Sequence, residues 1–193
     1  MKLGKEYWQN RWKSEDTPWD IGYASPAIIN FLVEKVDKQA RILIPGCGNA
    51  YEAEALLKLG FTNVHIVDLS SSAIESFQKR VPSFPVNQIH CANFFDLNEQ
   101  YDVVVEQTFF CALNPTMRGT YARKMNEILE DKGQLIGLLF NVPLNEDKPP
   151  FGGDKAEYKI VFSPYFNILE MDITSDSIKP RAGRELFICL EKK

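Results

Sequence analysis

The chain has 193 residues and a mass of 22.1 kDa, which suits one domain and excludes a second catalytic domain. Its 45% hydrophobic and 25% charged residues are typical of a globular protein and exclude disorder or a fibre. The formal net charge of -4 argues against a surface that binds duplex nucleic acid, and it favours small ligands or protein partners.

No part of the sequence is typical of a targeting or membrane segment. No apolar run approaches the roughly 20 residues that a membrane-spanning helix needs, and charges interrupt the N-terminal stretch where a secretory signal would be apolar. The four cysteines are widely spaced: Cys47, Cys91, Cys111 and Cys189. Because none forms a C-x-x-C pair, we expect reduced thiols, no metal site and a cytoplasmic location.

Helical and strand patterns alternate along the first half of the chain. Apolar residues at helical spacing mark the helices, and short apolar runs mark the strands. Asn49 with Glu52, and Ser72 with Glu75, resemble capping boxes at helix starts. The predicted elements are, in order, a helix from Pro26 to Val36, a strand over 41–44, a helix after Asn49 that ends at Gly60, a strand over 64–67 closing on Asp68, and a helix from Ser72 to Val81.

The second half holds more strands and one predicted helix. The expected strands cover 86–90, 101–105, 134–140, 165–173 and 184–190, and the helix runs from Pro115 to Gly133. Residues 181–183 are a candidate turn that would make the last two strands an antiparallel hairpin. The segment 141–153 is rich in proline and glycine, so it is predicted to be a long loop and is a candidate lid.

This order of elements predicts an α/β fold. We expect a three-layer sandwich with a mostly parallel seven-stranded Rossmann-like sheet and a C-terminal antiparallel hairpin. The whole chain, residues 1–193, is expected to form one domain, with residues 1–24 as an aromatic arm that contains all three tryptophans.

A ligand site is predicted where the first strand ends. In open α/β sheets, ligands bind at the carboxyl ends of the strands. The first strand ends at Gly46 and Gly48, which let the backbone turn tightly and approach a ligand. Asp68 ends the second strand, where a carboxylate accepts hydrogen bonds from ribose hydroxyls. The alternative is that Asp68 only caps the helix that follows.

The glycine pattern helps to choose between nucleoside ligands. A dinucleotide fingerprint needs a third glycine where this chain has Tyr51, and no phosphate-binding P-loop pattern is present. An NAD-linked oxidoreductase is therefore disfavoured. An adenosyl ligand without a diphosphate, such as S-adenosylmethionine, fits the pattern better.

Several sequence blocks resemble the thiopurine S-methyltransferase superfamily, and within it the halide and thiol methyltransferase branch. The blocks lie in the family's order over roughly the first two thirds of the chain. They are Tyr7-Trp8-Gln9-Asn10-Arg11-Trp12, Thr17-Pro18-Trp19-Asp20-Ile21-Gly22, Leu43-Ile44-Pro45-Gly46-Cys47-Gly48, Val67-Asp68-Leu69-Ser70, Asn93-Phe94-Phe95-Asp96 and Thr108-Phe109-Phe110-Cys111-Ala112-Leu113. The combination of tryptophan, Thr-Pro-Trp-Asp and Pro-Gly-Cys-Gly motifs is specific.

The resemblance implies a class I methyltransferase that uses S-adenosylmethionine and releases S-adenosylhomocysteine. It also implies the cofactor contacts. The implied residues are an aromatic cover from the arm, the glycine turn, the ribose acid, a pair beside the adenine and one more polar residue: Trp8, Trp12, Trp19, Gly46, Gly48, Asp68, Asn93, Phe94 and Gln107. Arg118 matches a family arginine close to the acceptor.

Physical chemistry supports the role of the tryptophans. A sulfonium cation is attracted to an aromatic face by about 0.5–1 kcal/mol when exposed and by roughly 2 kcal/mol or more when desolvated. Trp8 and Trp12 are four residues apart, so a helix presents both on one face. The alternative is that these side chains form a hydrophobic stripe that holds the arm to the core.

The leading hypothesis is an enzyme that methylates small soft nucleophiles: thiols, sulfide, thiocyanate, halides or thiopurine-like thiones. Such acceptors carry no proton at attack, so no general base is needed, and no catalytic residue is assigned. His65 and His90 fall in predicted strands, where a structural role is expected. Candidate residues around the acceptor are Tyr23, Phe109, Phe110 and Arg118.

Two other functions stay open. One is a methyltransferase of the same fold with an oxygen or nitrogen acceptor, for which Glu106 at the end of the fourth strand is the candidate base. The other is a protein that binds S-adenosylmethionine without turnover. In each case the expected partner is a small molecule rather than a nucleic acid or a membrane, and the expected state is a monomer or weak dimer.

Overall fold

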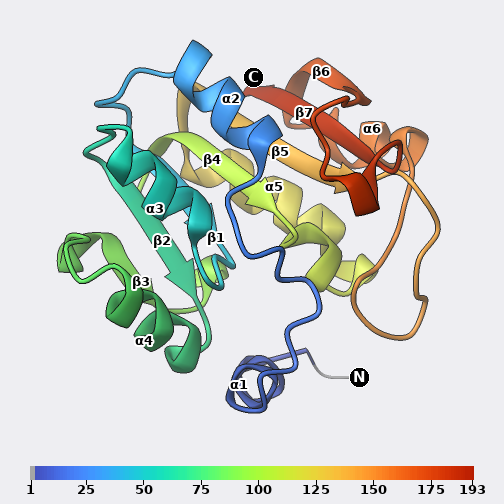
Figure 1. Cartoon of the computed structure of the whole chain (residues 1–193). Coiled ribbons are helices and arrows are strands. Elements are labelled where there is room, and N and C mark those ends of the chain that lie inside the picture. Colours follow the sequence, from blue (N-terminus) through green and yellow to red (C-terminus); the bar gives the residue numbers. More distant parts are fainter. Residues whose placement is uncertain (1–2) are drawn as a thin grey trace.

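A computed structural model describes residues 3–193 of the chain (Figure 1). Its centre is a seven-stranded sheet in the order β3-β2-β1-β4-β5-β7-β6. The strands are β1 (Ile42–Pro45), β2 (Val64–Asp68), β3 (Ile89–Cys91), β4 (Tyr101–Gln107), β5 (Leu129–Phe140), β6 (Phe166–Ile173) and β7 (Glu185–Lys192). Only β7 pairs antiparallel with its neighbours among these strands, which confirms the predicted mostly parallel sheet and the C-terminal hairpin.

Helices cover both faces of the sheet. On one face lie α2 (Pro26–Lys35), α3 (Tyr51–Lys58) and α4 (Ser71–Arg80), and on the other lie α5 (Arg118–Ile128) and α6 (Lys155–Phe162). Two hydrophobic clusters fill the spaces between the sheet and these helices. Because both faces are covered, β1 and β2 are buried along their whole length and consist largely of apolar residues.

The N-terminal arm lies outside these layers. Its helix, α1 (Lys5–Lys13), has no buried residue. Figure 1 shows α1 in blue at the foot of the view, beyond the edge toward which the parallel strands point. The strand order reverses between β1 and β4, and this switch point is where open α/β sheets bind ligands. The arm therefore closes the edge of the sheet at which a ligand is expected.

Both predicted capping boxes are wrong. Ala50, in the left-handed conformation at φ 50°, begins α3, and no side chain caps it. The start of α4 is capped by Ser70, which accepts a hydrogen bond from the Ala73 N–H group. Ser72 instead bonds to the arm, and Glu52 bonds to a distant backbone group. The spacing of these side chains suggested local caps, but in the structure they bond to residues that are distant in the sequence.

The predicted helix from Pro115 to Gly133 is shorter in the structure. A 3-10 turn covers Pro115–Met117, α5 ends at Ile128, and β5 already begins at Leu129. Leu129 pairs with Tyr101 of β4, so the sheet takes over residues whose local pattern continued the helix. Gly133 lies inside β5 rather than at a helix end.

Three other boundaries differ. The expected strand over 86–90 is a 3-10 turn at Val86–Gln88 followed by a shorter β3. The connection between β6 and β7 spans residues 174–184 and contains a 3-10 turn at Lys179–Arg181, so it is longer than the turn expected over 181–183. The helix α6 was not predicted. Asp154 caps it by accepting from the Glu157 N–H group, and this Asp-x-x-Glu pattern in the sequence could have indicated the start of a helix.

Candidate active site

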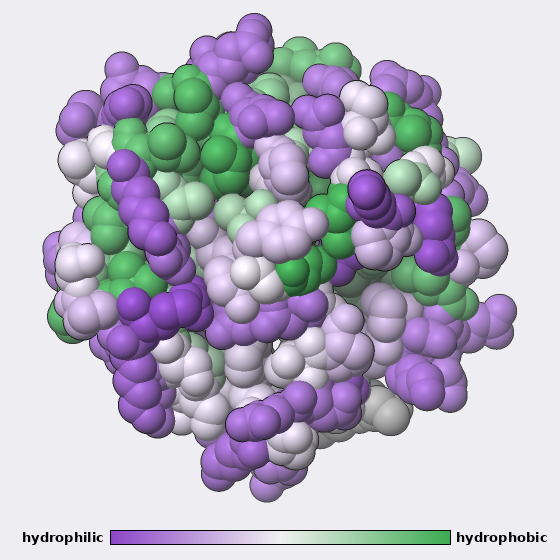
Figure 2. Space-filling view, in the orientation of Figure 1, coloured by the Kyte–Doolittle hydropathy of each residue, from purple (hydrophilic) through white to green (hydrophobic). Residues whose placement is uncertain are grey.

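A cavity of about 750 Å³ opens at the carboxyl ends of β1, β2 and β4, between the sheet and the arm. This volume lies in the range of roughly 300–1,000 Å³ that is usual for small-molecule sites. Figure 2, in the same orientation as Figure 1, shows a hollow in the surface just above the hydrophilic atoms at the foot of the view, where α1 lies. All the predicted cofactor residues lie in its wall: Trp8, Trp12, Trp19, Gly46, Gly48, Asp68, Asn93, Phe94 and Gln107.

The turn after β1 requires its two glycines. Gly46 and Gly48 have φ of 57° and 52°, which side-chain-bearing residues rarely adopt. A Cβ at Gly46 would lie 2.4 Å from the Phe109 ring, and a Cβ at Gly48 would lie 3.0 Å from the Trp12 ring. The turn thus lets two aromatic rings pack directly on the backbone at the cavity floor.

Asp68 combines a structural and a binding capacity. One carboxylate oxygen accepts from the Gly48 N–H group at 3.0 Å, and the other accepts from the Ser70 N–H group at 2.8 Å. Burial raises the pKa of Asp68, and these N–H groups oppose the rise. Each oxygen of a carboxylate accepts about two hydrogen bonds, so Asp68 retains acceptor capacity for ligand hydroxyls. The alternative role, capping the next helix, belongs to Ser70.

The three tryptophans form one cluster over the cavity. The Trp19 ring lies between the other two, with ring centroids 5.6 Å from Trp8 and 6.2 Å from Trp12. The Arg11 guanidinium lies 5.0 Å from the Trp19 ring centroid. All three indoles are half-buried and line the cavity, so they belong to its wall rather than to the core.

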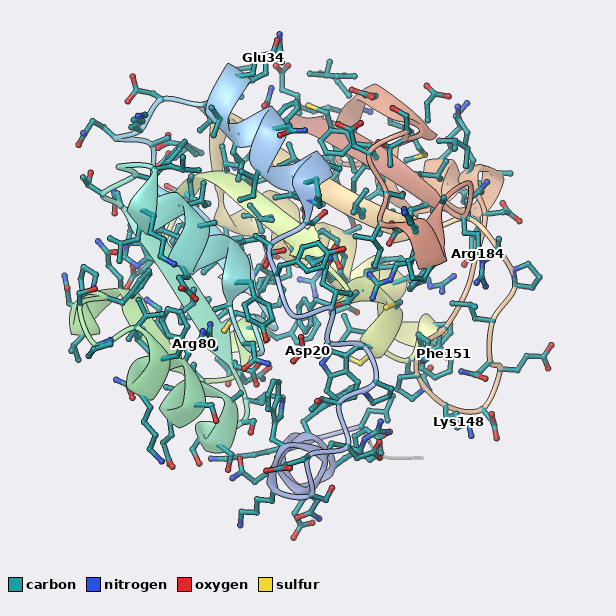
Figure 3. All side chains as sticks on the ribbon, in the orientation of Figure 1. Asp20, Glu34, Arg80, Lys148, Phe151 and Arg184 are labelled. Atoms are coloured by element: carbon teal, nitrogen blue, oxygen red, sulfur yellow. The ribbon has the colours of Figure 1, made fainter. Side chains whose placement is uncertain are left out.

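Two sets of hydrogen bonds fasten the arm to the body. Gln9 donates to the Ser72 hydroxyl at 2.7 Å and accepts from the Ser70 hydroxyl at 2.8 Å. Asp20 accepts from the Asn49 amide at 2.6 Å and from the Tyr51 hydroxyl at 3.2 Å. Figure 3 shows Asp20 on the arm, on the side toward α3. Tyr51, which replaces the third glycine of a dinucleotide site, thus serves to hold the arm.

Two other residues of the cavity wall, Asn93 and Gln107, have free hydrogen-bonding capacity. The amide oxygen of Asn93 accepts from the Phe95 N–H group at 3.2 Å, which leaves its NH₂ group as a donor. The amide oxygen of Gln107 is buried and has no hydrogen-bond partner within residues 3–193. A buried acceptor without a partner costs free energy, so a ligand that donates a hydrogen bond fits here.

Glu106 lies next to this wall but outside it. One of its oxygens accepts from the N–H groups of Phe109 and Phe110, at 2.8 and 2.9 Å, and the other accepts from the Tyr121 hydroxyl. Burial raises its pKa to about 7. The carboxylate supports the turn that carries Phe109, where Thr108 has φ of 58°. Its engagement on both oxygens weighs against the role of base that was considered for it.

The predicted acceptor residues separate into two pairs. Tyr23 and Phe109 line the cavity. Phe110 is buried in the cluster between the sheet and α5, outside the cavity lining. Arg118 is also buried outside it, where it pairs with Glu157 and donates to the Gly152 carbonyl at 2.6 Å.

Glu52 and Arg181 line the cavity although neither was predicted as a site residue; Glu52 was expected only to cap a helix. Glu52 is buried and accepts from the Ser25 N–H group at 2.9 Å, and burial raises its pKa. Arg181 donates to the Trp19 carbonyl at 3.1 Å and to Glu185 at 3.3 Å. Glu52 follows the glycine turn closely in the sequence, and this position could have indicated a residue of the cavity wall. Nothing local marked Arg181, because its position depends on how the last two strands return to the site.

The histidines lie away from the cavity. His65 and His90 face each other across β2 and β3, with ring nitrogens 3.2 Å apart, and His65 also meets Asn63. Burial lowers the pKa of His65 to about 4, so it is neutral at physiological pH. Neither histidine belongs to the cavity wall, as expected for structural residues.

The thiols in the wall are held in their protonated form. Cys47 and Cys111 both line the cavity, and burial raises the pKa of the Cys47 thiol well above its usual value and that of Cys111 to about 12. A thiol rather than a thiolate is a weak nucleophile and a poor metal ligand. Within residues 3–193, no group of three acidic, histidine or cysteine side chains is placed to hold a metal ion, and no helix has the length and apolarity to cross a membrane.

These residues fit S-adenosylmethionine. Asp68 and Gln107 offer acceptors for hydroxyl and amine hydrogens, Asn93 offers a donor, and the indoles offer faces to a sulfonium cation. The wall also includes Tyr23, Phe109, Phe140 and Arg181, and the volume of about 750 Å³ leaves space for a second small molecule.

Comparison with known proteins identifies relatives. A family model described as thiopurine S-methyltransferase matches residues 3–191. The probable thiol methyltransferase 2 of Arabidopsis thaliana is 30% identical over 186 residues, which cover 92% of this chain and 81% of that protein. The thiocyanate methyltransferase 1 of the same plant is 29% identical over 184 residues, with the same coverage.

Solved structures show the same fold. A magnesium protoporphyrin IX methyltransferase from Synechocystis PCC 6803 with bound S-adenosylmethionine aligns with a TM-score of 0.76 at 13% identity, covering 100% of this chain and 98% of that one. A Burkholderia thailandensis 1,6-didemethyltoxoflavin-N1-methyltransferase with bound S-adenosylhomocysteine aligns at 0.79 and 14% identity, covering 98% and 87%. With the class I methyltransferase fold and a family match over nearly its whole length, the chain belongs to the thiopurine S-methyltransferase family of S-adenosylmethionine-dependent methyltransferases.

Proposed function

We propose that this enzyme methylates small soft nucleophiles: thiols, sulfide, thiocyanate, halides or thiopurine-like thiones. The observation that carries the proposal is the apolar wall of the cavity beyond the glycine turn. It consists of aromatic rings, proline rings and a leucine: Tyr23, Phe109, Phe140, Leu144, Pro149 and Pro150. Hydration weakens a halide or thiolate as a nucleophile, so a wall of apolar side chains favours such acceptors. The named activities of the plant relatives point the same way.

The proposal assigns the cofactor to the described wall. Bound S-adenosylmethionine supplies an electrophilic methyl group on a sulfonium sulfur. Asp68 accepts hydrogen bonds from ribose hydroxyls, Asn93 and Phe94 adjoin the adenine, and Gln107 uses its free amide oxygen toward the ligand. The indole of Trp19, held between two other indoles, attracts the cation and excludes water.

A base-dependent oxygen or nitrogen acceptor is less favoured. Within residues 3–193, the wall contains no histidine, and Glu106 lies outside it with both oxygens engaged. Glu52 is the carboxylate in the wall that a base mechanism would use, because burial raises its pKa toward the range where it can exchange a proton. For a soft anion the chain needs to position the acceptor and exclude water, and no proton has to move.

Further parts of the proposal concern the domain, the acceptor and the location. The family resemblance supports a single domain over residues 1–193 whose first 24 residues cover the cofactor. The net charge of -4 supports a small-molecule acceptor over a nucleic acid or a membrane surface. Reduced cysteines support a cytoplasmic enzyme, which we propose to be a monomer or weak dimer.

Transfer of a labelled methyl group from S-adenosylmethionine tests the proposal. The acceptor panel is bisulfide, iodide, thiocyanate, thiophenol and a thiopurine, assayed with the wild type and with Trp19→Ala and Asp68→Ala. We expect turnover on at least one acceptor and a loss of roughly tenfold or more in kcat/KM in both variants. Asp131→Ala, which removes an exposed carboxylate at the far end of β5, is the matched control and is expected to keep wild-type turnover.

Two outcomes contradict the proposal. If no acceptor in the panel is methylated while S-adenosylmethionine still binds, the acceptor is an oxygen or nitrogen compound, or the protein binds the cofactor without turnover. If turnover falls in Glu52→Gln with a pH profile that loses its acidic limb, a base takes part and the soft-nucleophile mechanism is wrong.

A further inference from the structure

Arg80, the last residue of α4, lies outside the cavity wall and holds the segment at the start of α3. One terminal nitrogen of its guanidinium donates to the backbone carbonyl of Asn49, and the other donates to the Asn49 side-chain oxygen at 3.4 Å. Its Nε donates to Glu54 at 2.9 Å, and the guanidinium carbon lies 4.7 Å from the ring centroid of Tyr51. These contacts together fix the conformation of Asn49 and Tyr51.

Asn49 and Tyr51 are also the residues that fasten Asp20 of the arm. The Asn49 NH₂ group donates to one Asp20 carboxylate oxygen at 2.6 Å, and the Tyr51 hydroxyl donates to the same oxygen at 3.2 Å. Because a guanidinium holds the oxygen of the Asn49 amide, the NH₂ group of that amide is directed to Asp20. Figure 3 shows Arg80 and Asp20 on either side of the start of α3. Arg80 thus orients both donors from which this oxygen of Asp20 accepts.

Asp20 connects these contacts with the aromatic cluster over the cavity. It directly follows Trp19, and its second carboxylate oxygen accepts from the Gly22 N–H group at 2.7 Å, which closes a tight turn in the arm. No residue from 3 to 24 is buried, so the arm depends on polar contacts and half-buried rings rather than on core packing. Gln9 provides one set of polar contacts with the body, and Asp20 provides another. The placement of the Trp19 indole therefore depends on what holds Asp20.

We propose that Arg80 is a positioning residue of an arm latch, formed with Asn49, Tyr51 and Asp20, that slows release of S-adenosylhomocysteine from the cavity. The proposal rests on the cofactor placement proposed above and adds to it a residue outside the cavity wall. Without the Arg80 contacts, Asn49 and Tyr51 are free to turn away, and Asp20 exchanges oriented donors for water. The closed arm then loses free energy relative to the open arm, from which the ligand leaves.

The tryptophans make the arm latch directly observable. The chain has three tryptophans, and all of them lie within residues 1–24. Intrinsic tryptophan fluorescence therefore reports on the arm alone and needs no label. Acrylamide quenching without ligand measures how accessible the indoles are, and stopped-flow fluorescence measures the dissociation rate of S-adenosylhomocysteine. The first measurement tests the latch even if the cofactor placement is wrong.

The test compares Arg80→Met with the wild type. Methionine keeps an unbranched side chain but removes every hydrogen bond of the guanidinium. We expect the quenching constant to rise by about half or more and the dissociation rate of S-adenosylhomocysteine to rise roughly fivefold. Arg80→Lys keeps the charge but not the planar fork, so its rate is expected between the two. Tyr51→Phe leaves Arg80 in place and removes one hydroxyl from the latch, so it should raise the rate about twofold.

A double-mutant cycle separates the latch from a general effect on the turn after β1. Arg80 also holds the Asn49 carbonyl beside Ala50, which has the left-handed conformation, so its loss also weakens the turn itself. If Arg80 acts through Asp20, Arg80→Met should change the dissociation rate by less than about 1.5-fold in an Asp20→Ala background. The same fold-change in both backgrounds would mean that Arg80 only supports the turn, and it would overturn the proposal.

Lys79→Met is the matched control, because it removes an equal charge from the neighbouring exposed position of α4. It is expected to keep the wild-type quenching and dissociation rate, and a change as large as that in Arg80→Met would reduce the effect to one of charge and overturn the proposal. Unchanged quenching and dissociation in Arg80→Met would overturn it as well. If the wild type does not bind S-adenosylhomocysteine but Arg80→Met alone raises the quenching, the latch stands and the proposed cofactor placement fails.

Discussion

Glu106 shows how a single buried carboxylate shapes the site from outside it. Its oxygens hold the N–H groups of Phe109 and Phe110 and the hydroxyl of Tyr121, which fixes the turn that places the Phe109 ring against Gly46. The ring occupies the space that a side chain at Gly46 would need. The cavity floor therefore depends on a carboxylate that lies outside the cavity wall.

This arrangement predicts a pH dependence of stability. Burial raises the pKa of Glu106 from 4.5 to about 7. An acid whose pKa rises on folding contributes fully to stability below pH 4.5 and loses that contribution as the pH rises to about 7, a loss on the order of 3 kcal/mol. Glu106→Gln removes this titration, so urea unfolding between pH 5 and 8 should give a flatter curve than the wild type. Parallel curves would contradict the assignment.

At the scale of single residues, the sequence was most informative where a residue type is unusual for its position in the fold. Glycines at a strand end, an acid closing the next strand and tryptophans in a polar arm all entered the cavity wall. The sequence suggested Arg118, which lies outside the cavity wall, and it gave no sign of Arg181, which lies in the wall. Whether an arginine faces a cavity depends on side-chain partners supplied by distant segments, here Glu157 and Trp19. The spacing of residues along the sequence does not show which distant residues these arginines will bond to.

Among the elements, the loop over 141–153 is fastened rather than free at its C-terminal end. Arg118 donates to the Gly152 carbonyl and pairs with Glu157 of α6, while its guanidinium lies 5.0 Å from the Phe110 ring centroid. The Phe151 N–H group donates to the Cys111 carbonyl at 2.8 Å. Figure 3 shows Phe151 at the inner side of this loop. Since Pro149 and Pro150 line the cavity, Arg118 acts on the acceptor wall through the loop.

Arg118→Met tests this indirect role. We expect KM for the acceptor to rise several-fold and the free energy of unfolding to fall by about 1–3 kcal/mol, because the Gly152 carbonyl loses a charged donor. The affinity for S-adenosylmethionine, measured by titration, should stay within about twofold. Arg123→Met, on the exposed side of the same helix, should change neither quantity. A fall in cofactor affinity as large as the rise in KM would contradict the role.

Element boundaries were predictable where local and tertiary preferences agree. Strands β1 and β2 and helix α2 match their expected ranges closely because buried apolar runs and a proline start were decisive. The helix expected to reach Gly133 ends at Ile128 because β4 pairs with the residues that follow. The caps of α3 and α4 were misassigned because their polar side chains bond to Ser25 and to the arm instead. In each failure, a long-range contact replaced a local one.

Across the whole molecule, the core and the cavity are built from different parts of the chain. No residue between 3 and 24 is buried, whereas core residues begin at Ala27 on α2. The fold class followed from the alternation of elements along the sequence. That the arm would line the ligand cavity was expected only from the family resemblance. The periodicity of a half-exposed helix does not show which part of the molecule it will cover.

This division predicts that residues 25–193 fold without the arm. Removal of residues 1–24 should leave the core intact and the unfolding transition cooperative, while the free energy of unfolding without ligand falls by a few kcal/mol at most, because half-buried indoles and the hydrogen bonds of Gln9 and Asp20 are lost but no core residue is. At a cofactor concentration of 100 times its Kd the full chain should gain about 2.7 kcal/mol, and the truncated chain should gain much less. Urea unfolding with and without S-adenosylhomocysteine measures both. An uncooperative transition in the truncated chain would contradict the division.

The separation has a consequence for how such enzymes diverge. The arm lines the cavity with three tryptophans, Asp20 and Tyr23 but adds no residue to the core, so substitutions there can alter ligand contacts while the core packing stays the same. The tryptophans stand in sequence blocks that the family shares, whereas the apolar wall proposed for the acceptor includes Tyr23 of the arm and Leu144, Pro149 and Pro150 of the loop over 141–153. Directed evolution of acceptor range is accordingly best aimed at these four residues, because none of them is buried in the core.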